Sequence, residues 1–448
     1  MKDLLAKLPP LEAFALHSMQ TLAAQDPEIY QLVQDEWERL HSTIPLVAAE
    51  NWCSPASLGT LGSVLSINTC EGFPGRRYHA GAEVIDRIER LAIERAKAVF
   101  GAEYANVQPH SASQANQIAL MTLCPVGGRI MGLGLDVGGH LSHGAPPNWS
   151  AHVFDSQPYE LCSESLRLDY EQIRSRALEF RPHVLICGAS SYPRALDFAR
   201  FRAIADEVGA FLLADISHIA GLVAAGEHPS PVPHAHIVTT STYKPGGPRG
   251  GLILVGEDRR LPRQPRALSA QLQRWTFPGI QGTPAFNNIA GKAVLFAEMQ
   301  QSEYKRRQTQ IVHNAKALAS GLEEAGYQLV TGGTDNHLLL VDLRDKGITG
   351  KQAQEWLESC GILTNKNQLP FDERNATHTS GLRLGTPMVT GLGMKEAEMS
   401  LLVQWLDSAL TQVINAVQLS TSPEKCWADA LREEIRLWRK QSFPGLGA

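Results

Sequence analysis

The sequence is poor in cysteine, and its cysteines lie far apart. There are 7 cysteines in 448 residues, an odd number, and no two of them form a Cys-x-x-Cys pair. Neither a disulfide framework nor a cysteine-based zinc site is therefore indicated. Because disulfides belong to oxidising compartments, this usage favours a reducing, cytoplasmic location.

The sequence also lacks long apolar runs and a strong excess of charge. No apolar run approaches the length of a membrane span, and the first residues, MKDLLAKLPPLEAF, lack the apolar core of a signal peptide. The formal net charge is only -5, so a basic surface for nucleic acid or acidic lipid is not indicated. We therefore expect small-molecule partners, and neither nucleic acid nor a membrane.

Short apolar strands alternating with helical segments fill the middle of the chain. From about residue 88 to 293, runs such as RIMGLGL, HVLICGAS, GAFLLAD and HIVTTST are separated by helical patterns such as LDFARFRAIADEVG. This alternation is typical of an α/β fold whose largely parallel sheet is covered on both faces. A chain of 448 residues accommodates two or three domains. We predict a helical arm over 1–42, a large domain over 43–300, and a smaller α+β domain with a helical tail over 301–448.

One lysine stands at the end of a predicted strand. In VTTSTYKPGGPRGG, residues 238–251, a β-branched run leads to Lys244, and a turn rich in proline and glycine follows at once. The turn cannot continue the strand, since proline lacks an amide donor and glycine permits tight backbone paths. A lysine held on such a loop suits covalent reaction with a carbonyl compound, although a solvated lysine at a strand end is the plainer interpretation.

Polar side chains follow two other predicted strands. GAFLLA is followed by Asp215 and His218, and HVLICGA is followed by Ser190. Ligands bind beyond the carboxyl ends of parallel strands, so these groups should gather beside Lys244. The combination suits pyridoxal 5′-phosphate, because an aspartate pairs with the pyridinium nitrogen, a lysine carries the aldehyde and a hydroxyl binds the ring oxygen. For Asp215, a helix N-cap is an equally open interpretation.

Two further motifs fit such a cofactor. In HSASQAN, Ser111 and Ser113 stand where a helix begins, and a helix N-terminus favours an anion such as phosphate, although serine is also a common N-cap. In VGGHLSHG, His140 and His143 are three residues apart. No carboxylate or thiol flanks them closely, so a flat imidazole over a cofactor ring is favoured over a metal site, and no metal is expected.

Two charged residues complete the candidate site. Arg383 lies alone in the apolar strand of SGLRLGTP, and Glu71 lies in the glycine-rich turn CEGFPGRRYHAG. A buried arginine needs a carboxylate partner, which is either a structural Asp or Glu or the carboxylate of an amino-acid substrate. For Glu71 taken alone, a surface turn is the plainer interpretation.

Taken in order, these motifs resemble the serine hydroxymethyltransferase family over about residues 30–415. The resemblance implies a pyridoxal-phosphate enzyme of fold type I, the aspartate-aminotransferase-like fold, that forms a homodimer or a tetramer with shared active sites. It implies reversible transfer of a hydroxymethyl group between a serine-type amino acid and the co-substrate tetrahydrofolate, giving glycine or alanine and 5,10-methylenetetrahydrofolate. The matching segments are ANVQPHSASQAN, GGHLSHG, GASSYPR, DISHIAGLVAAG, GPRGG, FPGIQG, GGTDNHLLLVDLR, TNKN and SGLRLGTP.

The resemblance also implies roles for single residues. Lys244 would hold the cofactor covalently, Asp215 would pair with its pyridine nitrogen, and His140 would stack on its ring. Arg383 would bind the substrate α-carboxylate, and Glu71 would act as acid and base in the active site of the partner subunit. The other implied cofactor residues are Ser111, Ala112, Ser113, Asn116, Ser190, His218, Tyr243, Gly282, Thr283 and Thr69, and the implied substrate or folate residues are Ala49, Tyr78, His79, Leu135, Gly139, Leu141 and Asn367.

Departures from the family pattern cluster at the expected substrate pocket. Ala49 replaces a serine and Thr69 replaces a tyrosine, and both changes should widen the pocket near the substrate Cα. We therefore expect an α-substituted serine such as 2-methylserine to be accepted, as by an α-methylserine hydroxymethyltransferase, because breaking the bond to the hydroxymethyl carbon needs no α-proton. Thr283 could return a hydroxyl to the phosphate. The other departures are His79 for a tyrosine, Tyr243 for a histidine, and the shortened turn Pro245-Gly246-Gly247.

Two other functions stay open from the sequence. One is a folate-independent aldolase or transaldolase that acts on β-hydroxy amino acids. Leu135, Leu141 and Asn367 argue against it, whereas His79 leaves it open. The other is a non-catalytic binding protein that only has the shape of the family. Retention of the lysine, aspartate, arginine and glutamate of the expected site argues against that interpretation.

Overall fold

The computed structural model describes residues 9–262 and 266–443 and is built around one large sheet. This sheet has seven strands in the order β4-β10-β9-β8-β7-β5-β6. All neighbouring strands are parallel except β10, which is antiparallel to β4 and β9. The predicted mostly parallel sheet is therefore confirmed. Its strands are β4 (Tyr104–Asn106), β5 (Arg129–Leu133), β6 (Asp155–Tyr159), β7 (Val184–Cys187), β8 (Phe211–Asp215), β9 (Ile237–Ser241) and β10 (Gly251–Val255).

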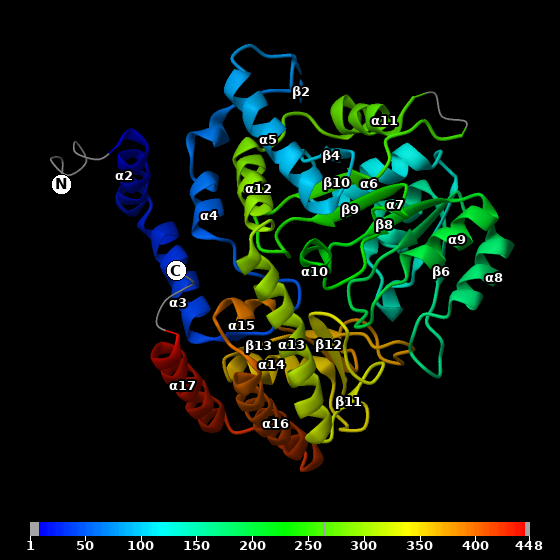
Figure 1. Cartoon of the computed structure of the whole chain (residues 1–448). Coiled ribbons are helices and arrows are strands. Elements are labelled where there is room, and N and C mark those ends of the chain that lie inside the picture. Colours follow the sequence, from blue (N-terminus) through cyan, green and yellow to red (C-terminus); the bar gives the residue numbers. More distant parts are fainter. Residues whose placement is uncertain (1–8, 263–265, 444–448) are drawn as a thin grey trace.

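Helices cover both faces of the large sheet (Figure 1). All four residues of β7 are buried: Val184 and Ile186 pack in one core cluster, and Leu185 and Cys187 pack in the other. Burial on both faces explains why the central strands read as unbroken apolar runs. One face packs against α6 (Ala112–Leu123), α7 (Trp149–Val153) and α11 (Leu268–Arg274), and the other against α5 (Glu83–Phe100), α8 (Tyr170–Phe180), α9 (Phe198–Val208), α10 (Ala220–Ala225) and α12 (Phe286–Glu298).

A smaller unit follows, built on a four-stranded antiparallel sheet in the order β11-β12-β15-β14. The chain enters this unit early, since β1 pairs with β13 and Ile44 and Leu46 lie in the core of the smaller unit. Its strands are β1 (Ile44–Pro45), β11 (Gln328–Leu329), β12 (Leu338–Asp342), β13 (Ile362–Leu363), β14 (Asn365–Asn367) and β15 (Gly381–Gly385), and its helices are α13 (Ser302–Glu324), α14 (Gly350–Ser359), α15 (Pro387–Gly391), α16 (Glu396–Gln418) and α17 (Lys425–Ser442).

Both ends of the described chain are helical. Of the expected arm over 1–42, residues 1–8 lie outside the described residues, and α2 and α3 form the rest. Figure 1 shows α2 projecting from the body of the molecule. The tail docks, because α17 buries Leu431 and Ile435 in the core of the smaller unit; residues 444–448 lie outside the described residues. The remaining segments are α2 (Pro10–Gln25), α3 (Pro27–Ser42), α4 (Pro55–Leu61), η1 (Val64–Ile67), β2 (Gly72–Phe73), β3 (Arg76–Arg77), η2 (Leu135–Val137), η3 (Leu141–His143) and η4 (Trp275–Ile280).

Membrane spans and disulfides were expected to be missing. Among the residues that the structure describes, no helix is both long enough and apolar enough to cross a membrane. All seven cysteines are free, and Cys70, Cys124, Cys187 and Cys360 are buried. Those four act as small apolar side chains of the cores.

Candidate active site

The carboxyl edge of the large sheet brings together residues from both units. Asp215 ends β8, and Lys244 follows β9 by three residues. Arg383 comes from β15 of the smaller sheet, and its Nη1 donates a hydrogen bond to the backbone oxygen of Ser190 at 2.6 Å. Its Nε donates to Asn365 Oδ1 at 3.0 Å. The smaller unit therefore places one arginine at the edge where the predicted catalytic groups lie.

The turn that carries Lys244 is held by several hydrogen bonds. Asn51 Nδ2 donates to the backbone oxygen of Lys244 at 3.0 Å, and the Tyr304 hydroxyl donates to that of Pro245 at 2.8 Å. The Lys244 amine itself lies 3.4 Å from Ser241 Oγ and 4.7 Å from the centroid of the Tyr243 ring. Among the described residues no carboxylate forms an ion pair with it. A fixed backbone with an uncommitted, partly buried amine is the arrangement that a nucleophilic lysine needs.

Asp215 is a buried carboxylate with four hydrogen bonds. Its Oδ2 accepts from Asn116 Nδ2 at 2.8 Å and from His143 Nε2 at 3.1 Å, and its Oδ1 accepts from the Ser217 amide at 3.0 Å and the Ser217 hydroxyl at 2.6 Å. Burial alone would raise the pKa of Asp215, but the hydrogen bond from His143 and its positive charge hold that pKa well below its usual range. The helix N-cap interpretation is wrong, because Ile219 caps the following helix α10.

His143 was considered from the sequence only as a partner of His140 in a metal site. The structure instead directs His143 Nε2 at Asp215, while its buried Nδ1 has no hydrogen-bond partner in the part of the chain that the structure describes. Ligating atoms of His140, His143 and Asp215 lie within 4.8 Å of one another, a spacing that a metal ion could use. The hydrogen bond between His143 and Asp215 already commits two of those atoms to each other.

His140 lies on the glycine-rich loop next to this pair. Its Nδ1 lies 2.8 Å from the Ser142 hydroxyl, and its ring centroid lies 5.5 Å from that of His143. Burial, reinforced by the neighbouring His143, lowers the pKa of His140 to about 4. The ring is therefore neutral at pH 7, and a neutral flat ring suits stacking on a cofactor.

The N-terminus of α6 approaches the same edge. The Ser111 hydroxyl accepts a hydrogen bond from the Gln114 amide at 3.1 Å, so Ser111 is the N-cap. A hydroxyl that accepts one hydrogen bond still has its proton to donate. The first-turn amides of Ala112 and Ser113 have no partner inside the helix. Asn116, fully buried one turn later, links α6 to the Asp215 carboxylate and to the loop of His140 through Ser142.

The residues expected to bind folate flank the glycine-rich loop. Leu135 and Leu141 lie on η2 and η3 and are 40% and 44% exposed. A Cβ atom at Gly139 would collide with the backbone oxygen of Leu133, so the loop needs glycine there. Asn367 Nδ2 reaches Ser191 Oγ at 3.4 Å from β14 of the smaller unit. The side chains of Leu135 and Leu141 are therefore exposed and can contact a ligand.

A second group of predicted residues lies apart from the first. The Glu71 amide donates to His79 Nδ1 at 3.3 Å, and a Cβ atom at Gly282 would lie 3.1 Å from Glu71 Oε1. Tyr78 is 75% exposed, and its ring contacts that of Phe277. In the described chain, no hydrogen bond, ion pair or ring contact joins this group to Lys244, Asp215 or Arg383. Thr69 and Thr283 belong to the same segments and are at least partly exposed.

Sequence reasoning missed the partner of His218. His337 lies directly before β12, and its Nε2 lies 3.3 Å from His218 Nδ1 with the two rings stacked. The pair joins the two units and, with Lys244, lines a cavity of about 10 Å³. Burial lowers the pKa of His337 to about 3, helped by the charges of Arg383 and Lys244. Its motif, GGTDNHLLLVDLR, gave no reason to select the histidine before the structure showed its neighbour.

Because His337 is buried, we expect the protein to lose more stability in acid than a variant that lacks this histidine. Its pKa is depressed in the folded protein, whereas an unfolded histidine titrates near 6.5, so from about pH 6.5 down to 3 the unfolded chain binds a proton that the folded chain does not. His337→Gln should therefore lose less stability than the parent, by about 1–3 kcal/mol, when urea unfolding is compared at pH 7 and pH 4.5. The exposed His152→Gln is the control, and equal losses in all three proteins would contradict the prediction.

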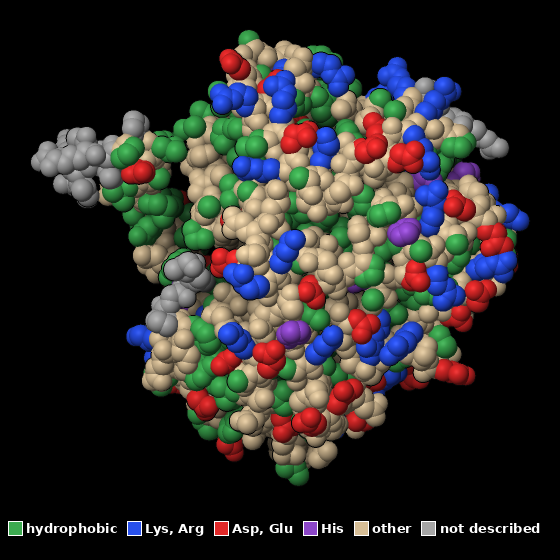
Figure 2. All heavy atoms as spheres, viewed as in Figure 1, with side chains coloured by type: hydrophobic (Ala, Val, Ile, Leu, Met, Phe, Trp, Pro, Cys, Tyr) green, Lys and Arg blue, Asp and Glu red, His purple; other side chains and the backbone are tan. Residues whose placement is uncertain are grey.

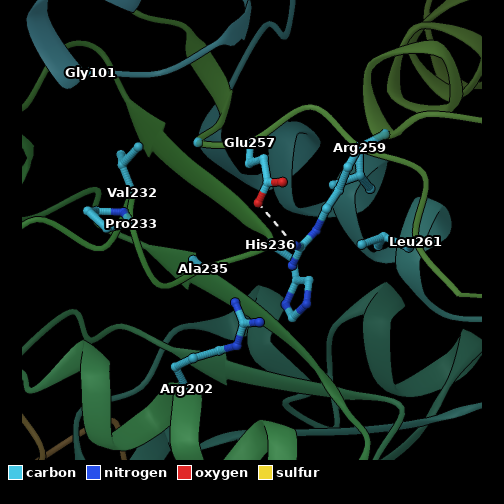
Figure 3. Close-up of a pocket in the computed structure, with 11 residues that line it drawn as sticks. Gly101, Arg202, Val232, Pro233, Ala235, His236, Glu257, Arg259 and Leu261 are labelled. Carbon is cyan, nitrogen blue, oxygen red and sulfur yellow. Dashed lines mark ion pairs between the residues drawn. The ribbon is translucent and has the colours of Figure 1, made fainter.

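A larger cavity, of about 280 Å³, lies at the opposite edge of the large sheet, beside His236, which precedes β9. Figure 3 shows Arg259 paired with Glu257 above it and Arg202 below it. These charges are already engaged: Arg259 and Glu257 lie 3.0 Å apart, and Arg202 Nε donates to Asp206 at 2.8 Å. The carboxyl edge is therefore the better candidate for the active site, because no carboxylate of the described residues forms an ion pair with Lys244 or Arg383 there.

Comparison with known proteins identifies the family. A sequence model of the family described as serine hydroxymethyltransferase matches residues 22–406. This chain belongs to the serine hydroxymethyltransferase family. Among its relatives, the serine hydroxymethyltransferase of Nostoc punctiforme is 50% identical over 380 residues, 85% of this chain and 87% of the relative. That of Myxococcus xanthus is 50% identical over 396 residues, 88% of this chain and 93% of the relative.

Membership of the family confirms the predicted fold, the pyridoxal-phosphate fold type I. The family uses pyridoxal 5′-phosphate and tetrahydrofolate, and the residues present fit the first of these. Asp215 is ionised, as pairing with a pyridinium requires, and the Lys244 amine is uncommitted. Arg383 is a poorly solvated cation with no carboxylate partner among the described residues, so an amino-acid carboxylate would complete its surroundings.

Proposed function

We propose that this protein is a pyridoxal-phosphate-dependent hydroxymethyltransferase. It reversibly transfers the hydroxymethyl group of a serine-type amino acid to tetrahydrofolate, giving glycine or alanine and 5,10-methylenetetrahydrofolate. The observation that carries the proposal is the meeting of three groups at one sheet edge: the Lys244 amine, the ionised Asp215, and Arg383, which forms no ion pair with a carboxylate of the described residues. Any one of these three groups alone would be compatible with many other functions.

Each group at the edge would hold one part of the cofactor. The cofactor supplies an electron sink that stabilises the charge left on the amino-acid Cα when its bond to the hydroxymethyl carbon breaks. Lys244 would hold the aldehyde carbon, and Asp215, fixed by Asn116 and His143, would keep the ring nitrogen protonated. The α6 N-terminus, with Ser111, Ala112 and Ser113, would bind the phosphate. His140 would lie against the ring, with Ser190, His218 and Tyr243 close by.

Two residues would handle the substrate. Arg383 would orient the amino acid by its α-carboxylate, because its forked guanidinium matches a carboxylate and keeps free donors beside Ser190 and Asn365. Glu71 would take the proton from the substrate hydroxyl oxygen in one direction and return it in the other. The folate would be enclosed by Leu135, Gly139, Leu141 and Asn367. Tyr78 and His79, which lie near Glu71, would also line the substrate or folate pocket.

A homodimer with shared sites would unite the two groups of residues. Among the described residues of one chain, no hydrogen bond, ion pair or ring contact joins the group around Glu71, Gly282 and Thr283 to Lys244, Asp215 or Arg383. The helical arm and the segments that lead to Glu71 carry an exposed apolar surface, part of which is visible in Figure 2. A surface of this kind marks an interaction site. Its members include Leu11, Phe14, Met19, Ile29, Leu32, Val33, Trp37, Leu58, Val64 and Ile67.

A mixed dimer tests the sharing. Co-expression of Lys244→Ala and Glu71→Gln chains under two different tags gives a heterodimer in which, with shared sites, one of the two active sites keeps both residues. Its turnover should be about half that of the wild-type dimer, whereas both variant homodimers should be nearly inactive. If Glu71 served its own chain, neither site of the heterodimer would be intact. A heterodimer as inactive as the homodimers would contradict the prediction.

We further propose that the active site accepts an α-substituted serine. Ala49 adjoins Ala48, whose backbone packs against Gly385 at the end of the strand that carries Arg383. A small side chain at this position, together with Thr69 from the partner subunit, leaves room next to the carboxylate site. The proposal predicts turnover of 2-methylserine to alanine.

A substrate panel tests both proposals. Serine and 2-methylserine are assayed with and without tetrahydrofolate, using the wild type, Ala49→Ser and Thr69→Tyr. We expect folate-dependent release of alanine from 2-methylserine by the wild type, and a drop of about tenfold when either side chain is enlarged, since overpacking a pocket costs 1–3 kcal/mol. A strong preference of the wild type for plain serine would rule out the α-substituted substrate. Full activity without folate would instead favour the aldolase function.

Two organisational features remain proposals. The chain would divide into an arm over 1–42, a large domain over 43–300 and a small domain over 301–448. Although β1 lies in the range of the large domain, it pairs with β13 and packs in the core of the smaller unit. The seven free cysteines support a reducing, cytoplasmic location.

A further inference from the structure

Lys292 is a buried lysine that the reaction outlined above does not use. It lies on α12 and is 1% exposed. Its amine donates three hydrogen bonds, all to backbone oxygens: to Val107 at 2.7 Å, to Gly251 at 2.9 Å and to Pro109 at 3.1 Å. Within the described chain no carboxylate forms an ion pair with it. Burying a charged amine costs free energy, so a buried lysine with three backbone acceptors is expected to have a structural or functional role.

The three oxygens belong to two segments that frame the candidate phosphate site. Val107 and Pro109 lie on the loop from β4 to Ser111, the N-cap of α6. Gly251 begins β10, directly after the turn that carries Lys244, and its amide donates to the Pro109 oxygen at 2.9 Å. The Lys292 amine therefore ties the loop before α6 to the end of the Lys244 turn.

The turn leaves space for this amine. A Cβ atom at Gly250 would lie 2.6 Å from Lys292 Nζ and would overlap its Cε, so a larger residue there would displace the lysine head. A Cβ atom at Gly251 would overlap the backbone oxygen of Ser111. Two consecutive glycines thus allow the turn, the loop before α6 and the lysine to approach closely.

We propose that Lys292 is a positioning residue for the phosphate group of the cofactor. It fixes the backbone of residues 107–111, and so the direction of the α6 amides. Burial lowers the pKa of Lys292 to about 7, and in its protonated form the amine adds a positive charge close to that helix N-terminus. Both effects favour a bound dianion. The proposal rests on the proposed binding of pyridoxal 5′-phosphate, and it assigns Lys292 to the phosphate alone and not to the ring or the aldehyde.

The test compares a ligand that has the phosphate with one that lacks it. Dissociation constants of pyridoxal 5′-phosphate and of pyridoxal are measured by fluorescence quenching on the apo forms of the wild type and Lys292→Met. We expect the constant for pyridoxal 5′-phosphate to rise about tenfold or more in the variant, while that for pyridoxal changes by less than about twofold. Inorganic phosphate should also compete less well with the cofactor in the variant.

Tyr304→Phe is the matched control. It removes a buried hydrogen bond to the Lys244 turn, at Pro245, without touching the loop before α6. It should weaken both ligands alike or neither. If Lys292→Met does not fold, Gly250→Ala replaces it, since the added methyl displaces the amine while keeping its charge. Equal weakening of both ligands, or none, in the folded variant would overturn the proposal. A wild type that binds neither ligand would instead refute the proposed function.

Discussion

Replacing Lys244 by alanine is expected to abolish covalent retention of pyridoxal 5′-phosphate and to lower turnover by about 10³-fold or more, because the amine that holds the aldehyde is lost. The structure offers no substitute close by. Among the described residues, the Lys244 amine forms a hydrogen bond with Ser241 and a ring contact with Tyr243, and no other lysine amine shares them. Lys292, the buried lysine next to the turn, already donates to three backbone oxygens. The absorbance band that bound cofactor gives in the visible region should therefore disappear after dialysis.

Lys346→Ala is the matched control for this experiment. Its amine also lies over a tyrosine ring, 5.1 Å from the Tyr327 centroid, but in the smaller unit, where it donates to the Gly326 oxygen. That variant should keep both the visible band and the turnover. Addition of a small primary amine to Lys244→Ala should restore part of the turnover. A Lys244→Ala protein that stays coloured and active would assign the covalent role elsewhere.

The sequence predicted the central sheet well for a physical reason. Strands such as β7 and β8 are buried on both faces, so almost every position in them must be apolar and the run is visible locally. Asp215 ends such a strand, and Lys244 and Ser190 follow two others. The parallel direction of the strands then brings all three to one edge. Arg383 was predictable in a similar way, as a lone charge in an apolar strand.

Features that depend on distant partners were not predictable. Nothing local indicates that β1 pairs with β13, more than 300 residues later, because the pairing is decided by the core of the smaller unit. His143 was equally unpredictable, because histidine is a common metal ligand but this one forms a hydrogen bond with Asp215. Nothing local indicated that His337 lies against His218. Lys292 lies in an ordinary helical pattern, and only the three oxygens around its amine distinguish it.

Arg383→Met is expected to raise the KM for the amino acid about 100-fold or more while changing the stability of the folded protein by no more than about 2 kcal/mol. The first effect follows because a buried carboxylate without its cation costs several kcal/mol. The second follows because burial lowers the pKa of Arg383 to about 10, so the free protein carries a desolvated cation without a carboxylate partner. Methionine removes that cation and fills most of its volume.

Two hydrogen bonds from the charged Arg383 side chain, to Ser190 and to Asn365, oppose the gain from removing the cation, at about 1.5–3 kcal/mol each. Desolvation of a cation without a carboxylate partner costs several kcal/mol, so the two contributions nearly cancel and stability should change little. Arg383→Lys is the control, since it keeps a charge but loses the fork that matches a carboxylate, and it should lose affinity without gaining stability. Urea unfolding and steady-state kinetics on the same preparations measure both quantities. A large loss of stability in Arg383→Met with an unchanged KM would mean that the arginine serves the fold, and the carboxylate of the substrate would have to be bound by another group.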